Sequence, residues 1–560
     1  MRKPSGKTRS LVVVIASAFA PVAMGQSASA DRELSEIKVQ QSRPTMVTSS
    51  PAPQSEVTGE QIRDFNAVNV EDAVKYLPSL QIRKRYVGDR NSIIASRTAG
   101  TVQSARSLVY ADGLLLSNLL GNSYAFPPRW NVVGTEEIDT VNVLYGPYSA
   151  LLPGNSAGAT VLMTTRRPES LEVHARAQAF SENFKLYGTD RTFDGHQEQV
   201  SGGLRTGNLS ISLFGNHLDS YGHPMSFGTA TYVGGGGGTP VTGFYKDKDP
   251  TGADRVIVSG YGMDHTVQDV GKIRLAYDFT RDTRLALTVA EWRNNSTTTA
   301  DSYIRNAAGT PVTSGNINVN GVQYSLSASH FAPGSSETLN RLYGLTFDSQ
   351  MSPDWRFEGA MSLYDTAVDI TRAATNATAA GGSVTFGDGT GWQNLDLRSV
   401  WKPGQGKYGH ALTFGYHRDA YRYVSNKYNA TNWRDENTKT TLSSRNEGRT
   451  RTDALYVQDE WKFAPRWMLT AGLRHERWQA YDGNIYSTTL GNNNFARREE
   501  SGTSPKLSLA YDLTTDWLLR ASFGKAYRYP TVTELFQTET QGAVTRISDP
   551  SLRPEQVRSS

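Results

Sequence analysis

Cysteine is absent from this sequence of 560 residues. The chain therefore cannot be held together by disulfides, and its core or its sheet hydrogen bonds must stabilise it. After residue 30 the sequence also lacks any apolar run of the ~20 residues that a membrane-spanning helix needs, which excludes a helical membrane protein. Glycine (51) and tyrosine (27) are abundant, and the mean hydropathy is polar, at −0.49. This composition is typical of outer-membrane barrels, in which only every second strand residue faces lipid.

Residues 1–30 have the features of an export signal. An apolar segment, Leu11–Ala20, precedes the A-x-A cleavage pattern Ala28-Ser29-Ala30. The alternative is a membrane anchor, for which the apolar segment is too short. The basic residues in front of it are Arg2, Lys3, Lys7 and Arg9.

Removal of the signal changes the charge balance. Lys+Arg falls from 58 to 54 and then equals the 54 Asp+Glu, so the formal net charge falls from +4 to 0. A neutral chain gives no support for binding nucleic acid. Residues 31–56 follow as a polar linker rich in Ser, Pro and Gln, in which Glu36–Gln40 alternates polar and apolar residues.

A small mixed domain is predicted for residues 57–168. Thr58–Ile62 has the pattern of a helix start, and Val70–Leu77 has helical spacing before Pro78. Further on, short β segments are predicted on both sides of tight glycine turns. The segments are Ser107–Ala111, Leu114–Leu116, Ile138–Leu144 and Ala159–Thr165, and the turn residues are Asp112, Gly113, Gly146, Pro147, Gly154 and Gly158.

Residues 169–560 alternate polar and apolar residues, with connections that are short and long in turn. In Arg284–Trp292, for example, Leu285, Leu287 and Val289 share one face. A soluble β-sandwich also gives this alternation. Short turns that alternate with long polar loops, at about 219–264, 296–337, 369–390, 425–449 and 481–500, favour a transmembrane barrel. Five of the ten tryptophans lie beside short turns, where an interfacial aromatic belt belongs: Trp355, Trp401, Trp461, Trp467 and Trp517.

These patterns together resemble the TonB-dependent outer-membrane receptors. Leu108–Leu116 (LVYADGLLL) and Ile138–Arg166 follow the order of the family's plug motifs, and Asp72–Leu80 (DAVKYLPSL) matches an earlier one. Tyr145 stands where the family usually has Arg, and Leu151-Leu152-Pro153 replaces its Tyr-Gly. The barrel motifs are Ala454–Trp461, Leu469–His475, Ser504–Phe536 and Asp549–Glu555.

The resemblance implies a transmembrane antiparallel β-barrel with an N-terminal mixed α/β plug domain inside it. The family has 22 strands and about 13 candidates are present here, so we expect residues 169–560 to form an incomplete barrel of a longer receptor. The outer membrane of a Gram-negative bacterium is the implied location, with lipid and lipopolysaccharide as neighbours. The TonB box would be Glu36, Ile37, Lys38, Val39 and Gln40, which pairs as an added strand with TonB, itself coupled to ExbB/ExbD; a plain disordered tether is the alternative.

Ligand would meet the top of the plug, where cations and aromatic side chains suit an anionic, ring-bearing ferric siderophore. The alternative is that the cations pair with acidic residues of the barrel wall. The candidates are Arg83, Lys84, Arg85, Tyr86, Arg90, Tyr124, Phe126, Arg129 and Trp130.

Enzymatic and cofactor motifs are weak. Gly154–Gly158 fits G-x-S-x-G, but a β segment follows it where a serine hydrolase needs a helix. Asp247, Asp249 and Thr251 resemble the start of a calcium loop that lacks its closing Glu. Nine scattered histidines show no ligand spacing, so no metal site, cofactor or catalytic residue is predicted.

The expected function is TonB-energised import of a scarce nutrient, most often a ferric siderophore. A passive pore, a surface adhesin or an outer-membrane esterase is the alternative from another class. Cobalamin, haem, another metal chelate or an oligosaccharide is the alternative cargo.

Overall fold

The computed structural model describes residues 51–64, 66–100, 102–404, 409–514, 517–541 and 544–560. The predicted export signal and TonB box lie outside these residues. Among the described residues, no helix has the length and the apolar character to cross a membrane.

The N-terminal part is a plug of short elements around one mixed sheet, in the order β1-β6-β7-β4-β5. β4 pairs with β7 in parallel, and the other neighbours in this sheet are antiparallel. Its elements are β1 (Gln54–Thr58), α3 (Gly59–Asp64), η1 (Val70–Val74), β2 (Leu80–Arg83), β3 (Ile93–Ser96), η2 (Ser104–Arg106), β4 (Leu108–Ala111), β5 (Leu114–Leu115), η3 (Trp130–Val132), η4 (Thr135–Glu137), β6 (Ile138–Tyr145), η5 (Gly154–Ala157) and β7 (Ala159–Thr165).

The sequence located most of these elements. The predicted strands correspond to β4 to β7, and Asp112 and Gly113 adopt φ of 49° and 86° in the turn between β4 and β5. The helical spacing at Val70–Leu77 gives only a 3₁₀ turn, η1, because Pro78 follows too closely for a longer helix. The plug sheet begins at Gln54, inside the expected linker, where β1 pairs with β6.

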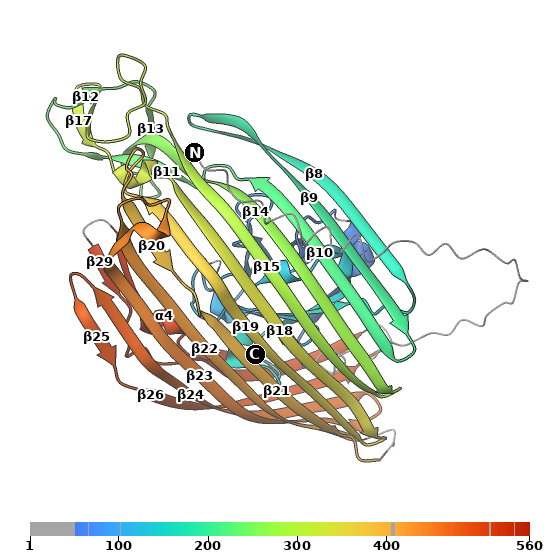
Figure 1. Cartoon of the computed structure of the whole chain (residues 1–560). Helices are drawn as coiled ribbons and strands as arrows, with labels where there is room; N and C mark the ends of the chain where they lie inside the picture. The colour runs from blue at the N-terminus through green and yellow to red at the C-terminus, as the bar shows by residue number, and fades with distance from the viewer. Residues whose placement is uncertain (1–50, 65, 101, 405–408, 515–516, 542–543) are drawn as a thin grey trace, which may run out of the picture. The chain divides into compact units, whose positions relative to one another are not determined.

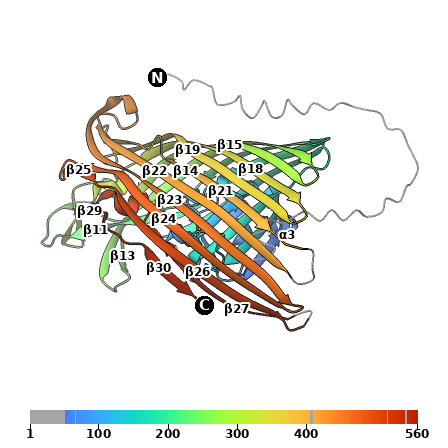
Figure 2. The same ribbon diagram turned by 90° about the horizontal axis from the view of Figure 1, so that it is seen from below.

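The long strands of the remaining chain form one antiparallel sheet, follow one another in sequence order and lie side by side around the plug (Figures 1 and 2). β30 follows β27 in the strand order and stands next to β8, which returns the sheet to its first strand. The long strands are β8 (Glu172–Leu186), β9 (Thr189–Thr206), β10 (Leu209–Tyr221), β14 (Asp254–Thr280), β15 (Thr283–Ser302), β18 (Gly334–Ser352), β19 (Trp355–Ala374), β21 (Gly391–Trp401), β22 (His410–Ala430), β23 (Lys439–Ala464), β24 (Trp467–Ser487), β26 (Arg498–Asp512) and β27 (Leu518–Arg528). Thirteen strands of eleven or more residues in the described part of the chain agree with the predicted number.

The shorter elements lie at the loop ends and near the C-terminus. They are β11 (Ser226–Tyr232), β12 (Thr239–Pro240), β13 (Tyr245–Lys248), β16 (Asn316–Val319), β17 (Val322–Ser325), η6 (Ala328–Phe331), β20 (Gly382–Phe386), η7 (Glu436–Thr438), β25 (Gly491–Phe495), α4 (Val532–Leu535), β28 (Thr538–Gln541), β29 (Val544–Ile547) and β30 (Glu555–Ser559).

The two faces of the wall differ as the alternation predicts. On β15, Leu287 is exposed while Ala286 and Ala290 are buried against the interior. Small inward residues leave room for the plug, and larger apolar residues face outward to lipid. The aromatic belt at the short turns is also present, since Trp355 stacks on Trp401 and Trp467 on Tyr511, at ring separations of 5.8 and 4.3 Å.

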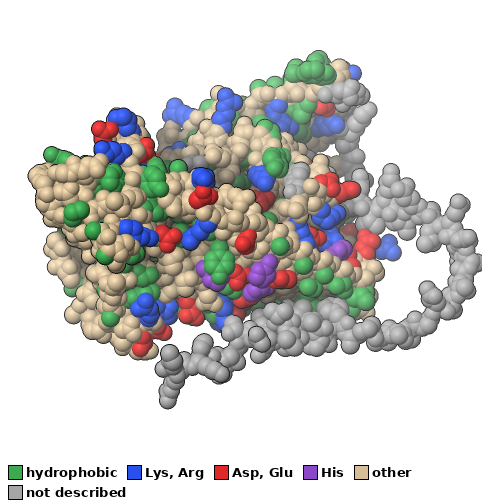
Figure 3. All heavy atoms as spheres, turned by 90° about the horizontal axis from the view of Figure 1, so that it is seen from above, with side chains coloured by type: hydrophobic (Ala, Val, Ile, Leu, Met, Phe, Trp, Pro, Cys, Tyr) green, Lys and Arg blue, Asp and Glu red, His purple; other side chains and the backbone are tan. Residues whose placement is uncertain are grey.

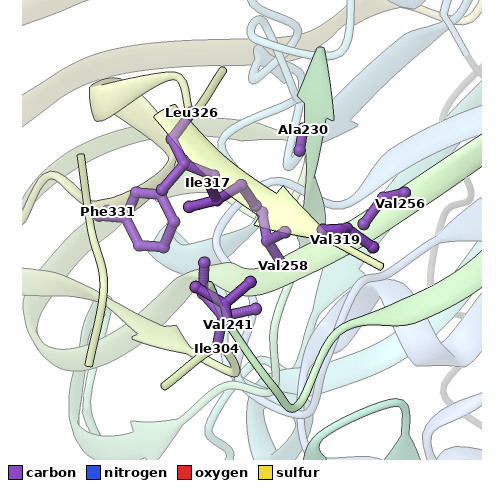
Figure 4. Close-up of a cluster of buried hydrophobic side chains, with 9 residues drawn as sticks. All are labelled: Ala230, Val241, Val256, Val258, Ile304, Ile317, Val319, Leu326 and Phe331. Atoms are coloured by element: carbon purple, nitrogen blue, oxygen red, sulfur yellow. The ribbon is translucent and has the colours of Figure 1, made fainter. Parts of the chain in front are cut away.

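The long polar loops of the prediction are largely strand. β14 begins at Asp254 and β15 ends at Ser302, so the ladder continues well into the segments expected to be loops. The loop ends around them enclose their own apolar core, which we call the loop core (Figure 4). Its members are Ala230, Val241, Val256, Val258, Ile304, Ile317, Val319, Leu326 and Phe331.

Candidate functional site

The β2–β3 hairpin presents the first group of candidate ligand residues. Its connecting segment is folded around Asp89, whose side chain is fully buried. Arg85 donates to both carboxylate oxygens of Asp89, at 2.8 and 2.7 Å, and its backbone N–H donates a third bond at 3.0 Å. Lys84 forms ion pairs with Glu71 and Asp72 of the plug, at 3.5 and 3.0 Å. Both cations therefore hold the plug loop together.

Two of the aromatic candidates also have structural contacts. Trp130 is 1% exposed, and its Nε1 donates to the backbone oxygen of Ser92 at 2.9 Å. Tyr86 is buried, and its hydroxyl donates to Asp264 on β14 at 3.3 Å. Burial and the negative charge of Asp264 raise the pKa of Tyr86. Tyr86 thus joins the plug to the wall as a neutral donor.

The other apical candidates contact aromatic rings. The Arg83 guanidinium lies 5.7 Å from the ring centre of Tyr124, which is 56% exposed. Arg129 lies 5.8 Å from the ring of Tyr364 on β19, and Phe126 meets Tyr423 of β22 edge to face at 6.3 Å. Arg129 and Phe126 thus bring the plug against aromatic side chains of the wall, while the Arg83–Tyr124 pair lies within the plug.

Arg90 belongs to the same region. Its charge, like that of Arg129, acts on the carboxylate of Asp369 on β19. Arg90 and Arg129 therefore interact electrostatically with an acidic residue of the wall. Arg85 instead uses an acid of the plug itself.

Sequence reasoning missed the aromatic side chains of the wall. Tyr364, Trp392 and Tyr421, from β19, β21 and β22, are all buried on the inner face. Tyr364 stacks on Trp392 at 4.1 Å with the rings 2° from parallel, and Tyr421 lies 6.4 Å from Trp392. The signal available in the sequence was a large aromatic residue at an inward position, where most residues are small or polar.

Polar contacts fix the underside of the plug to the wall. Arg274 of β14 donates to Asp112 at 2.9 Å, and Lys272 forms an ion pair with Glu137 at 2.8 Å. These side chains and Thr165 line a cavity of about 30 Å³ between plug and wall, enough for a water molecule. Burial alone would raise the pKa of Asp112, but Arg274 and the hydrogen bonds from Thr165 outweigh it and lower that pKa.

The opposite side of the plug meets the last strands of the sheet. Arg528 of β27 pairs with Glu534 and Glu555 at 2.8 and 2.7 Å, and Arg106 of the plug reaches Glu555 at 2.8 Å. Asn122 of the plug donates to Glu534 at 3.2 Å. Plug and wall therefore share one network of charges here.

Gly154 and Gly158 of the plug motif stand where backbone atoms of other segments leave no room for a side chain. A Cβ on Gly154 would lie 1.8 Å from the backbone oxygen of Tyr527, and one on Gly158 would lie 2.7 Å from that of Arg106. Gly146 has a φ of 80°, and the carbonyl of Pro147 accepts a bond from Lys506 of β26. Gly154 therefore lets the plug approach the wall closely, and Gly158 lets two segments of the plug approach each other.

The side chains of the hydrolase-like and calcium-like motifs form hydrogen bonds to residues close by in the chain. Ser156 lies in η5, is 1% exposed and donates to the carbonyl of Pro153 at 2.7 Å, while strand β7 follows it. The Asp249 carboxylate accepts from Thr251 and from the backbone N–H of Ala253, which is an ordinary turn.

A mixed plug held by polar contacts inside an antiparallel barrel defines a plugged transmembrane β-barrel. A family model described as "TonB dependent receptor-like, beta-barrel" matches residues 214–559, and one described as "TonB-dependent Receptor Plug Domain" matches residues 47–160. The chain belongs to the TonB-dependent receptors. The predicted fold class and family are thereby confirmed.

Relatives and solved structures agree with this assignment. The ferric enterobactin receptor of Pseudomonas aeruginosa (strain PAO1) is 23% identical over 419 residues, which are 72% of this chain and 48% of that protein. The chain thus spans about half the length of this curated relative.

The solved structures show the shared fold. The unliganded ferric citrate transporter FecA has a TM-score of 0.61 at 13% identity, over 91% of this chain and 67% of that one. The ferric yersiniabactin uptake receptor FyuA from Yersinia pestis has a TM-score of 0.55 at 17% identity, over 86% of this chain and 65% of that one. The copper transporter OprC has a TM-score of 0.56 at 15% identity, over 90% of this chain and 68% of that one.

Proposed function

We propose that this receptor imports a ferric siderophore across the outer membrane of a Gram-negative bacterium, with energy delivered through TonB. One observation carries the proposal. Arg83 and Arg129 lie over aromatic rings at the top of a plug that ion pairs such as Lys272–Glu137 and Arg274–Asp112 join to the wall.

The apical chemistry supports an anionic cargo with rings. A guanidinium over an aromatic face offers a planar cation and a π surface together, and both suit a ferric complex of catecholate or related groups. The ferric names of the relative and of two of the similar structures favour iron chelates, and the copper transporter makes another metal chelate the second candidate.

The ion pairs and hydrogen bonds between the plug and the wall favour a plug that can be displaced. Hydrogen bonds and ion pairs exchange with water at little net cost, whereas an apolar interface would lose its burial energy when it opened. The force would enter through the TonB box, for which we retain Glu36–Gln40, by strand addition to TonB, which is coupled to ExbB/ExbD.

Uptake of radiolabelled ferric enterobactin and ferric citrate tests this function in cells that lack other receptors for them. Val39→Pro removes a donor from the proposed added strand, so we expect uptake to be lost while binding to whole cells remains. Thr48→Pro, in the same linker but outside the box, is the matched control and should transport normally.

Three results would contradict the mechanism. Full uptake by Val39→Pro would remove the TonB step. Steady ion conductance of the wild-type chain with its plug in place would favour a passive pore, and cell attachment without transport would favour an adhesin.

A further inference from the structure

Three neighbouring strands bring histidines and carboxylates together on the outer face of the wall. In the sheet register, His217 of β10 stands opposite Glu198 of β9 on one side and Asp269 of β14 on the other. His196 stands opposite Asp219. Figure 3 shows histidine side chains beside acidic ones on one face of the molecule.

Alternation along β9 places this cluster outside. Gln197 and Gln199 are each 4% exposed, and Gln199 accepts a hydrogen bond from Thr135 of the plug. The side chains of His196 and Glu198, at the intervening positions, are about half exposed. Val200 and Leu204 continue the same face toward the short turn and are exposed apolar residues. The cluster therefore begins where the apolar band of the wall ends.

The donor atoms are close enough to share one ion. His196, Glu198 and His217 each offer one ligand atom, and these atoms lie within 4.8 Å of one another. The Asp269 carboxylate is 2.7 Å from Nδ1 of His217, so Nε2 is the nitrogen of that ring left for a metal ion. A carboxylate on the far nitrogen is how metal-binding histidines are commonly oriented.

The charges around the cluster also call for a cation. In the described part of the chain, the ion pairs of Glu198, Asp219 and Asp269 are all with histidines: His196, His265 and His217 respectively. Elsewhere on this face an arginine balances an acid, as Arg341 does for Glu291 at 3.1 Å.

We propose that His196, Glu198 and His217 bind a divalent transition metal of the zinc class, and that Asp269 is a positioning residue for His217. Two imidazoles and a carboxylate suit zinc, nickel or copper better than magnesium or calcium, which prefer oxygen ligands alone. Three protein ligands leave a fourth position for water. This inference is independent of the proposed transport function.

The sequence hides this site because its ligands meet through strand register. His196 and Glu198 are two residues apart, which gives the same face of a strand, but His217 comes from the next strand of the hairpin. Spacing along the chain alone therefore gives no sign of the site.

Metal titration of the full chain, purified in detergent without a histidine tag and stripped with a chelator, tests the proposal. The probes are Zn²⁺ by calorimetry and Co²⁺ by its visible absorption. We expect one ion per chain, loss of that binding in His196→Ala and His217→Ala, and about 10- to 100-fold weaker binding in Asp269→Asn. His410→Ala is the matched control, because His410 also faces outward and pairs with an aspartate, Asp459, at 2.7 Å.

The proposal is overturned if the wild type binds Zn²⁺ no more tightly than a His196→Ala/His217→Ala double variant. It is also overturned if His410→Ala removes as much binding as His196→Ala, since the ion would then bind surface histidines without a built site. Glu198→Gln, which keeps the size of an exposed side chain, serves as a second variant if one of the alanine variants fails to fold.

Discussion

Nη1 of Arg274, on the barrel wall, lies 2.9 Å from Oδ2 of Asp112, in the tight turn of the plug. The same guanidinium nitrogen donates to Thr165 Oγ1, which itself donates to Asp112 at 2.6 Å. A turn residue that the sequence singled out for its backbone geometry thus also fixes the plug to the wall through its side chain.

Removing the arginine leaves a buried carboxylate without its cation. We expect Arg274→Met to destabilise the seating of the plug by about 3 kcal/mol, because both side chains of the pair are little exposed. Hydrogen exchange of the β4–β5 amides measures it. Arg341→Met, which breaks the exposed pair with Glu291, is the control and should have a much smaller effect. Equal effects of the two variants would contradict the role of burial.

The same pair predicts a dependence on acid. The pKa of Asp112 is lowered in the folded plug, so its stabilisation is fully present above the pKa of an unfolded aspartate. It is lost as the pH falls from about 4 through the lowered pKa. The β4–β5 amides should therefore lose protection in that window, and Asp112→Asn should lose less there than the wild type. A wild type that is unchanged at low pH would refute the prediction.

Gly154 is predicted to tolerate no side chain. A Cβ there would overlap the carbonyl of Tyr527, so Gly154→Ala should cost about 1–3 kcal/mol of plug stability. Gly100 has open space around its would-be Cβ, and Gly100→Ala should be close to neutral. Thermal unfolding of the two purified variants separates them, and similar melting temperatures would disprove the close contact.

The loop core should weaken in mild acid. Burial lowers the pKa of the His330 imidazole, which stacks on Tyr261 at 5.1 Å beside Phe331 of the loop core. A lowered histidine pKa means that stability is lost as the pH falls through the unfolded value of about 6.5. Exchange of the amides of residues 316–331 should accelerate between pH 7.5 and 5.5, after correction for intrinsic rates. His330→Phe should abolish this change, and its persistence in that variant would assign it to another group.

The apical cations divide into two classes by their contacts. Arg83→Ala should weaken binding of an anionic ferric chelate by about 3- to 30-fold and leave the plug intact, because Arg83 contacts an exposed ring. Arg85→Ala should instead destabilise the plug by about 3 kcal/mol, since it strips the buried Asp89 of its cation. Binding titrations and thermal unfolding of both variants distinguish these outcomes, and unchanged affinity in Arg83→Ala would remove it from the site.

The sequence predicted local features well but predicted contacts between distant segments poorly. Turns at Asp112 and Gly146 follow from backbone preferences, and the outward face of Leu287 follows from alternation. The bonds Arg274–Asp112 and Tyr86–Asp264 depend on which plug residue lies against which wall strand. The residue pattern of a single segment carries no information about such contacts between distant segments. The loop core was missed because short apolar groups such as Val256 and Val258 are diluted among glycines and polar residues.

The described chain enters the plug at a place that matters mechanically. The carbonyls of Pro51 and Ala52 accept bonds from Ser522 and Arg520 of β27, and β1 then forms an edge of the plug sheet. A pull at Pro51 directed away from the sheet would break these two anchors and the bond from the backbone N–H of Tyr145 to the carbonyl of Pro53. It would then separate Gln54 from Leu144 before the next pair is loaded. β1 would then separate from β6 one residue pair at a time. The force needed would be that of single pairs, and the pairing of β6 with β7 would stay intact.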